Sequence, residues 1–262
     1  MTTHPASAPA ARLRPYFATT GRILRQLRND PRTIAMILVV PAVLMVLLYF
    51  IYADTPTPPS QPFTLFDRVG MSMLGILPFV VMFLITAIAM QRERSSGTLE
   101  RLLTTPIAKL DLLAGYGSAF SLAAAAQAGV ACLIAFGLLD LDSAGNPGWV
   151  VLIAVVDAVC GVALGLLASA FARTEFQAVQ FMPVIVAPQL FLCGLLVPRG
   201  ELPGWLEAIS NVLPLSYAVD ALNQVATHPT ATGAMWRDLA VVAGFAVVAL
   251  CLAAATLRRR TA

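Results

Sequence analysis

The 262-residue chain carries little charge. Charged residues make up 12% of the sequence and hydrophobic residues 58%, whereas about a quarter of the residues in a soluble globular domain are charged. The mean hydropathy is +0.80. This balance excludes an ordinary soluble domain and predicts an integral membrane protein.

Histidine, cysteine and lysine are also scarce. The two histidines, His4 and His228, stand alone, and we interpret them as surface residues. The four cysteines form no Cys-x-x-Cys or Cys/His cluster, so neither a disulfide framework nor a metal site is expected. The single lysine, Lys109, lies in no Gly-x-x-x-x-Gly-Lys-Ser/Thr motif, which excludes an ATPase of the P-loop type. With no Ser/His/Asp arrangement either, we expect a non-catalytic chain without a cofactor of its own.

What the chain does contain is long apolar runs. A bilayer core about 30 Å thick requires roughly 20 apolar residues in a helix. Continuous runs of this length argue against a membrane β-barrel, whose strands alternate. The sequence therefore predicts an all-α integral membrane protein with six transmembrane helices, at residues 33–52, 69–90, 112–139, 149–171, 179–197 and 239–257.

Residues 12–30 predict an amphipathic helix that lies at the inner membrane surface. Leu13, Phe17 and Leu24 recur at helical spacing with arginines beside them. Two roles remain open for it, a basic anchor and a lever that contacts a cytoplasmic partner. Residues 1–11 predict a disordered tail, so residues 12–262 form a single transmembrane domain.

The basic residues predict the orientation, because cytoplasmic loops accumulate Lys and Arg. With six spans, only Arg68, Arg199 and Arg237 of the 17 basic residues lie on the side away from the termini, which leaves 14 on the other. Both termini are therefore expected in the cytoplasm, in a cytoplasmic membrane. The arginines follow the membrane face without interleaved aromatic residues, so no nucleic-acid partner is expected.

A polar segment, residues 91–109, follows the second predicted span. Gly97 permits a sharp change of direction. The leucines that follow share one face of a short amphipathic helix, which is too short to be stable alone. It rests either on lipid or in a groove of a protein partner. The residues expected to mediate docking are Glu93, Arg94, Gly97, Thr98, Leu99, Glu100, Arg101, Leu102 and Leu103.

Asp157, Gly161 and Gly165 share one face of the fourth predicted span. The Gly-x-x-x-Gly spacing allows a neighbouring helix to approach closely, so we expect Asp157 to point into packed protein. A carboxylate at bilayer depth costs about 2.5–3.5 kcal/mol on insertion scales, and must be partnered or protonated. Gln127 and Gln189 are the candidate partners. An interhelical clamp and a role in a substrate pathway both remain open.

The fifth predicted span contains Pro183 and Pro188. Each proline removes a backbone donor, so the helix is expected to be kinked or interrupted, with or without a role in lining a pathway. The outer segment, residues 198–238, is too polar to span and too apolar to be free in water. It predicts short re-entrant or interfacial helices.

Several motifs occur in order along nearly the whole chain. They are Leu77-Pro-Phe, Glu93-Arg-x-x-Gly-Thr-Leu-Glu-Arg-Leu, Cys193-Gly-Leu-Leu-Val-Pro, Leu202-Pro-Gly-Trp-Leu and Leu213-Pro-Leu-Ser-Tyr-Ala-Val-Asp-Ala-Leu. Together they resemble the permease subunits of type 2 ABC transporters, especially those similar to daunorubicin-resistance permeases. The resemblance implies six spans with both termini inside and a coupling helix after the second span that docks on an ATP-binding subunit. It also implies short helices that dip into the outer leaflet between spans five and six.

The same resemblance implies partners. Two copies of the ATP-binding subunit would carry ATP and Mg, and a second permease, identical or related, would complete the translocation unit. Because the spans offer mostly aliphatic and aromatic surface, we expect the export of a hydrophobic or amphiphilic substrate, a drug or a lipid. The alternatives are a permease that exports polysaccharide or glycolipid, a secondary transporter without an ATPase, and a membrane anchor that transports nothing.

Overall fold

The computed structural model describes residues 9–56, 63–98 and 109–256, and every regular element within them is helical, as predicted. In chain order the elements are α1 (Pro9–Arg28), α2 (Pro31–Tyr52), α3 (Leu65–Ser95), α5 (Lys109–Gly137), α6 (Pro147–Ser169), α7 (Glu175–Leu192), the 3₁₀ turn η1 (Arg199–Glu201), α8 (Gly204–Ser210), α9 (Pro214–Thr227) and α10 (Gly233–Thr256).

Local side-chain contacts set where the helices begin. The Asp30 carboxylate accepts a hydrogen bond from the backbone N–H of Thr33 at 3.2 Å, and Pro31 occupies the first turn of α2. At the start of α3 the Thr64 hydroxyl accepts from the backbone N–H of Asp67 at 3.1 Å, while the Asp67 carboxylate accepts from the Thr64 backbone at 2.8 Å. These caps satisfy N–H groups that have no partner within a helix.

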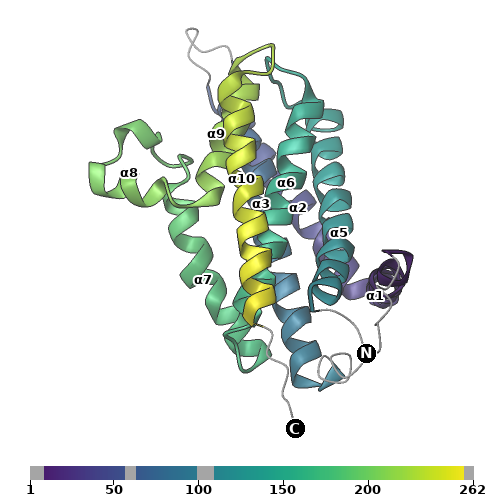
Figure 1. Ribbon diagram of the computed structural model, residues 1–262. Helices are drawn as coiled ribbons and strands as arrows, with labels where there is room; N and C mark the ends of the chain where they lie inside the picture. Colours follow the sequence, from purple (N-terminus) through teal and green to yellow (C-terminus); the bar gives the residue numbers. More distant parts are fainter. Residues whose placement is uncertain (1–8, 57–62, 99–108, 257–262) are drawn as a thin grey trace, which may run out of the picture.

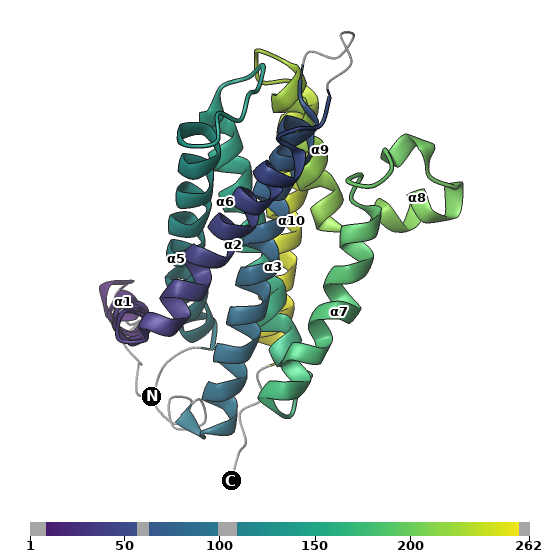
Figure 2. The ribbon, with the colours of Figure 1, turned by 180° about the vertical axis from the view of Figure 1, so that it is seen from behind.

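Helices α2, α3, α5, α6 and α10 run side by side as a bundle, with α3 and α6 at its centre (Figures 1 and 2). The contact between α3 and α6 is the most extensive in the described part of the chain, and α6 also packs on α5 and α10. Helix α1 lies across one end of the bundle, α7 leans against a flank and α8 projects to the side.

Two glycines allow α6 to approach α3 closely. A Cβ atom at Gly161 would lie 2.5 Å from the Phe79 carbonyl oxygen, and one at Gly165 would lie 2.5 Å from that of Phe83. Real Cβ atoms do not come this close to a backbone oxygen. The helices therefore meet backbone against backbone at the positions of the Gly-x-x-x-Gly motif.

Five helices of the described residues are long and apolar enough to cross a membrane, namely α2, α3, α5 from Leu112 onward, α6 and α10. They correspond to five of the predicted spans. The segment predicted at 179–197 corresponds to α7, which is not among the five because its 18 residues include Glu175, three glutamines and two prolines.

The end predicted for the fifth span, residue 197, is wrong. Helix α7 runs through Pro183 and Pro188 as one helix and ends at Leu192. Gly194 then adopts φ 94°, a left-handed conformation that glycine tolerates. The interruption therefore falls after Leu192 and not at the prolines.

Short helices fill much of the outer segment. The turn η1 and α8 follow the end of α7, and α9 begins beside α7 and runs toward the end of the bundle opposite α1 (Figures 1 and 2). Eight residues of α9 are buried, and they include Leu215, Val219 and Leu222. Helix α9 is thus a part of the packed molecule and not a surface loop.

Candidate functional site

Helix α1, the end of α3 and the α6–α7 connection gather at one end of the bundle, which we call the basic end (Figures 1 and 2). Arg68, in the first turn of α3, and Arg237, in the first turns of α10, lie toward the opposite end. The arginines on the elements of the basic end include Arg22, Arg25, Arg28, Arg32, Arg92, Arg94 and Arg173.

The predicted docking segment, residues 91–109, begins within the last turns of α3, which ends at Ser95. Ser96 caps the helix, and Gly97 adopts φ 71°, so the chain turns there as its glycine predicted. The Thr98 and Ser96 hydroxyls lie 2.9 Å apart. The remaining predicted docking residues, Leu99, Glu100, Arg101, Leu102 and Leu103, lie outside the described residues.

Glu93, one of the predicted docking residues, faces α1. Its side chain is 9% exposed, and its Oε1 lies 3.6 Å from Nη1 of Arg22 on α1. Arg22 also donates to the Tyr116 hydroxyl of α5 and places its guanidinium 5.7 Å from the centre of that ring. The residue expected to set docking register therefore joins α3 to α1 and α5 in this structure.

Helix α1 is fixed on α5 by close packing as well as by charge. A Cβ atom at Gly115 would lie 2.8 Å from Cγ2 of Thr19, so only glycine admits α1 at this distance. The Tyr16 and Ser118 hydroxyls lie 2.7 Å apart. These contacts make α1 a part of the helical assembly, in addition to any contact with lipid.

Two polar side chains near the docking segment have unmatched atoms. Nε and Nη2 of Arg94 are buried without a hydrogen-bond partner among the described residues, and so is Oε1 of Gln91. Burial of an unpaired polar group is costly. Arg94 is therefore a buried cation with two unpaired nitrogens among the residues that the structure describes.

Arg92 ties α3 to α7. Its Nε and Nη2 donate to the two carboxylate oxygens of Glu175 at 3.1 and 3.2 Å, in the paired geometry that favours arginine. Sequence reasoning did not identify Arg22, Tyr116 or Glu175. Each belongs to an element far along the chain from its partner, and only the fold brings them together.

Asp157 lies at the centre of the bundle, fully buried, and neither of its carboxylate oxygens has a hydrogen-bond partner among the residues that the structure describes. Gly75 of α3 stands opposite, where a Cβ atom would lie 3.5 Å from Oδ2 of Asp157. The expected pairing with Gln127 or Gln189 is wrong. Gln189 donates to the Ile185 carbonyl at 3.0 Å, and both side-chain polar atoms of Gln127 lack partners among the described residues.

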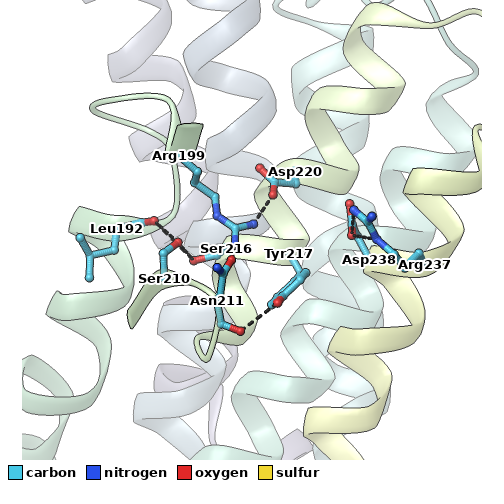
Figure 3. A network of polar contacts seen from close by, with 9 residues as sticks. All are labelled: Leu192, Arg199, Ser210, Asn211, Ser216, Tyr217, Asp220, Arg237 and Asp238. Atoms are coloured by element: carbon cyan, nitrogen blue, oxygen red, sulfur yellow. Dashed lines mark hydrogen bonds and ion pairs between the residues drawn. The ribbon is translucent and has the colours of Figure 1, made fainter. Parts of the chain in front are cut away.

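A polar network holds the break between α7 and α9 (Figure 3). The Ser210 hydroxyl donates to the Leu192 carbonyl at 2.8 Å, which satisfies a carbonyl at the end of α7, and lies 3.0 Å from the Ser216 hydroxyl. The backbone N–H of Leu215 donates to Oε1 of Gln189 at 3.4 Å. The polar groups exposed where α7 ends are therefore hydrogen-bonded to the segment that follows, although the helix does not continue.

Arg199 is the charged centre of the same network. It pairs with Asp220 of α9, donates to the side chain of Asn211 and lies 5.0 Å from the ring centre of Tyr217. The Tyr217 hydroxyl donates to the Asn211 carbonyl at 2.8 Å. Burial raises the pKa of the Asp220 carboxyl, and the Arg199 charge opposes that rise.

The described residues offer no group of three or more His, Cys, Asp or Glu side chains that could hold a metal ion. Instead, ion pairs join the helix ends at the basic end. The break between α7 and α9 is held by hydrogen bonds.

A family model described as "ABC-2 type transporter" matches residues 16–226. The match runs from α1 to the end of α9 and covers most of the chain. The protein therefore belongs to the ABC-2 type transporter family.

Curated relatives agree with this assignment. The chain is 27% identical over 251 residues to the "Probable doxorubicin resistance ABC transporter permease protein DrrC" of Mycobacterium tuberculosis. This match covers 93% of this chain and 89% of the relative. It is 24% identical over 168 residues to the "Probable multidrug ABC transporter permease YbhR" of Escherichia coli, over 64% of this chain and 46% of the relative. It is 29% identical over 172 residues to "ABC transporter G family member 20" of Dictyostelium discoideum, over 65% of this chain but 24% of that protein. The chain thus matches less than half the length of the last two.

Proposed function

We propose that the chain is the transmembrane permease subunit of an ATP-driven exporter that moves a hydrophobic or amphiphilic substrate across the cytoplasmic membrane. Membership of the ABC-2 type transporter family supports this proposal. So do the names of two relatives, which refer to multidrug transport and to doxorubicin resistance. The basic end then faces the cytoplasm, together with both termini.

In this arrangement α7 makes the fifth of six crossings. Its 18 residues rise about 27 Å at 1.5 Å per residue, close to the bilayer core of about 30 Å. The turn η1, α8 and α9 complete the outer part of the crossing as interfacial or re-entrant helices. Trp205 on α8 is 68% exposed, as suits a headgroup-level residue.

The observation that carries the proposal is the linkage of helix ends at the basic end. The segment after Gly97 joins α3 to α5, and the last turns of α3 are bound to α1 through Glu93 and to α7 through Arg92. A force on this segment therefore reaches four helices. We propose that a separate ATP-binding subunit, present in two copies and carrying ATP and Mg, applies that force at Thr98–Thr104. A second permease, identical or related, completes the route.

Charge reversal in the docking segment tests the proposal. Glu100→Arg or Arg101→Glu should lower nucleotide-dependent export by at least tenfold, because charged pairs at the interface set its register. Membrane insertion should be unchanged. The measurement is uptake of a fluorescent drug into inverted vesicles that contain the permease and its ATP-binding subunit, with and without ATP.

Arg173→Glu is the matched control. Arg173 is exposed on the α6–α7 connection, at the same end of the bundle but outside the docking segment, and its backbone rather than its side chain bonds Gln177. Export by this variant should stay near that of the unaltered protein. Full ATP-dependent export by both docking variants would contradict the proposed coupling role.

A further inference from the structure

The elbow where α1 meets α2 carries an excess of positive charge. Residues 12–53 contain six arginines and a single acidic residue, Asp30. Both oxygens of Asp30 already accept from Thr33, at 3.2 Å from the backbone N–H and 2.7 Å from the hydroxyl. The one carboxylate near the elbow in the sequence is therefore engaged in capping α2.

Three arginine side chains of the elbow face outward. The side chains of Arg25, Arg28 and Arg32 are exposed, and they make no hydrogen bond or ion pair with the residues that the structure describes. Arg22, by contrast, turns inward to Glu93. The described contacts therefore neutralise Arg22 and leave the other three charges unmatched.

Arg25 and Arg28 share a face of α1 with an exposed aromatic ring. At 3.6 residues per turn, positions 17, 21, 25 and 28 fall within about a quarter of the circumference of the helix. Phe17 is 63% exposed. Over Gly21, the only side-chain atom within 4 Å of a Cβ position is Nη2 of Arg25, at 3.9 Å, so the surface between ring and guanidinium is open. An apolar ring beside unpaired arginines is typical of a helix at a membrane surface.

Arg32 stands at the inner end of an exposed apolar stripe on α2. Met36, Val39 and Val43 follow it at spacings of four, three and four residues, and they are 50%, 53% and 48% exposed. Eleven residues of helix rise about 16 Å, close to half of a bilayer core of about 30 Å. Figure 2 shows α2 along the near side of the bundle with no other helix in front of it. A lipid of one leaflet matches this surface, with charge at one end and apolar side chains along the rest.

A second copy of the chain matches the elbow less well. The acidic side chains that the structure describes at the basic end are Asp30, Glu93 and Glu175. Each of them already has a partner, in Thr33, Arg22 and Arg92 respectively. A neighbouring copy therefore brings no free carboxylate to the three arginines from these residues, whereas an anionic headgroup supplies the missing charge.

We propose that the α1–α2 elbow binds an anionic phospholipid of the inner leaflet. Its phosphate-bearing headgroup lies among Arg25, Arg28 and Arg32, and an acyl chain lies along Met36 and Val39. The bound lipid holds α1 at the membrane surface, in addition to the packing of α1 on α5. The inference depends neither on the exported substrate nor on the ATP-binding subunit.

Native mass spectrometry of the full-length permease tests the preference. The protein is delipidated in detergent and mixed with dioleoyl phosphatidylglycerol or with dioleoyl phosphatidylcholine at the same concentration, and the fractions bound are compared. One basic residue near an anionic surface favours binding roughly fivefold, so we expect the anionic lipid to bind at least about fivefold more tightly. Excess inorganic phosphate should displace little of it, because phosphate has no acyl chain. Complete displacement by phosphate would overturn the assignment to a lipid.

Substitutions then locate the preference. Arg25→Gln, Arg28→Gln and Arg32→Gln combined should bring the two lipids to within about twofold of each other. Arg173→Gln is the matched control, since Arg173 is exposed at the same end but lies on the α6–α7 connection, and it should leave the preference intact. If the combined variant does not fold, Arg28→Gln and Arg32→Gln singly decide the question, and each should lower the preference at least about twofold.

Equal binding of the two lipids, or an unchanged preference in the arginine variants, would overturn the inference. The same spectra report the mass of the assembly. A dimer that requires the three arginines, without any preference for phosphatidylglycerol, would assign this face to a second copy and also overturn it. Because the assay contains no nucleotide, failed export leaves its result standing, and a lack of lipid preference leaves the exporter assignment standing.

Discussion

Among single residues, Asp157 is set in an unusual environment. It is fully buried between α6 and α3, its oxygens have no hydrogen-bond partner in the described part of the chain, and Gly75 leaves the space that its carboxylate fills. A charged carboxylate at this depth costs about 2.5–3.5 kcal/mol on insertion scales. Among the described residues no polar partner offsets this cost, so the position favours a neutral side chain of the same shape.

We therefore expect Asp157→Asn to fold and insert at least as well as the unaltered protein, with a melting temperature equal or higher. The measurement is size-exclusion chromatography with thermal melting in detergent. Gly75→Val is the paired change, because a Cβ atom there would already lie 2.8 Å from Cδ1 of Leu222, and it should lower the melting temperature. Loss of folded protein in Asp157→Asn would show that the carboxylate is a structural clamp after all.

Among the elements, the pairing of α3 with α6 depends on two glycines, and the pairing of α7 with α9 depends on a polar network. The first is a backbone contact with no room for a methyl group. The second uses Ser210, Ser216 and Arg199 to satisfy groups that a broken helix leaves free. The first contact is set by shape and the second by hydrogen bonds and an ion pair.

Gly161→Ala should destabilise the protein by about 1–3 kcal/mol, the usual cost of overpacking, because the new Cβ atom would meet the Phe79 carbonyl. Gly129→Ala in α5 is the control, since nothing lies within 4 Å of its Cβ position, and helix propensity there favours alanine. Thermal melting of the two variants measures the difference. Equal melting temperatures would mean that α3 and α6 are not held backbone to backbone.

For the whole molecule, the distribution of basic residues agrees with the up-and-down course of the helices. The elements that carry most of the described arginines meet at one end of the bundle (Figure 1). The sequence predicts that this end lies in the cytoplasm, because basic loops are retained there. Orientation in the membrane then decides which of the two ends an ATP-binding subunit can reach.

Single cysteines test that orientation in intact cells, with the exposed Cys251 first replaced by serine. Ala144→Cys, in the exposed α5–α6 connection, should react with a membrane-impermeant maleimide added from outside. Arg173→Cys, in the α6–α7 connection, should react only after permeabilisation. The reverse pattern would place the basic end outside and remove the proposed docking face from the cytoplasm.

Much of the candidate site could not be predicted from the sequence, because its side chains come from helices far apart in the chain. The turn at Gly97 was predictable because glycine tolerates its φ of 71°. The pairing of Arg92 with Glu175 was not, since 83 positions separate them. Glu93 was predicted to set docking register because it sits in a polar run, and its contact with Arg22 of α1 could not be read from that run.

The sequence by itself determined the membrane class, five of the helices that can cross and the glycines between α3 and α6, because long apolar runs and small residues act over a few helical turns. The tertiary structure decided where α7 ends, which groups surround Asp157 and Glu93, and how α1 is held on α5. Those outcomes depend on side chains from distant helices competing for the same donors and the same space, and the periodicity of a single segment contains no information about that competition.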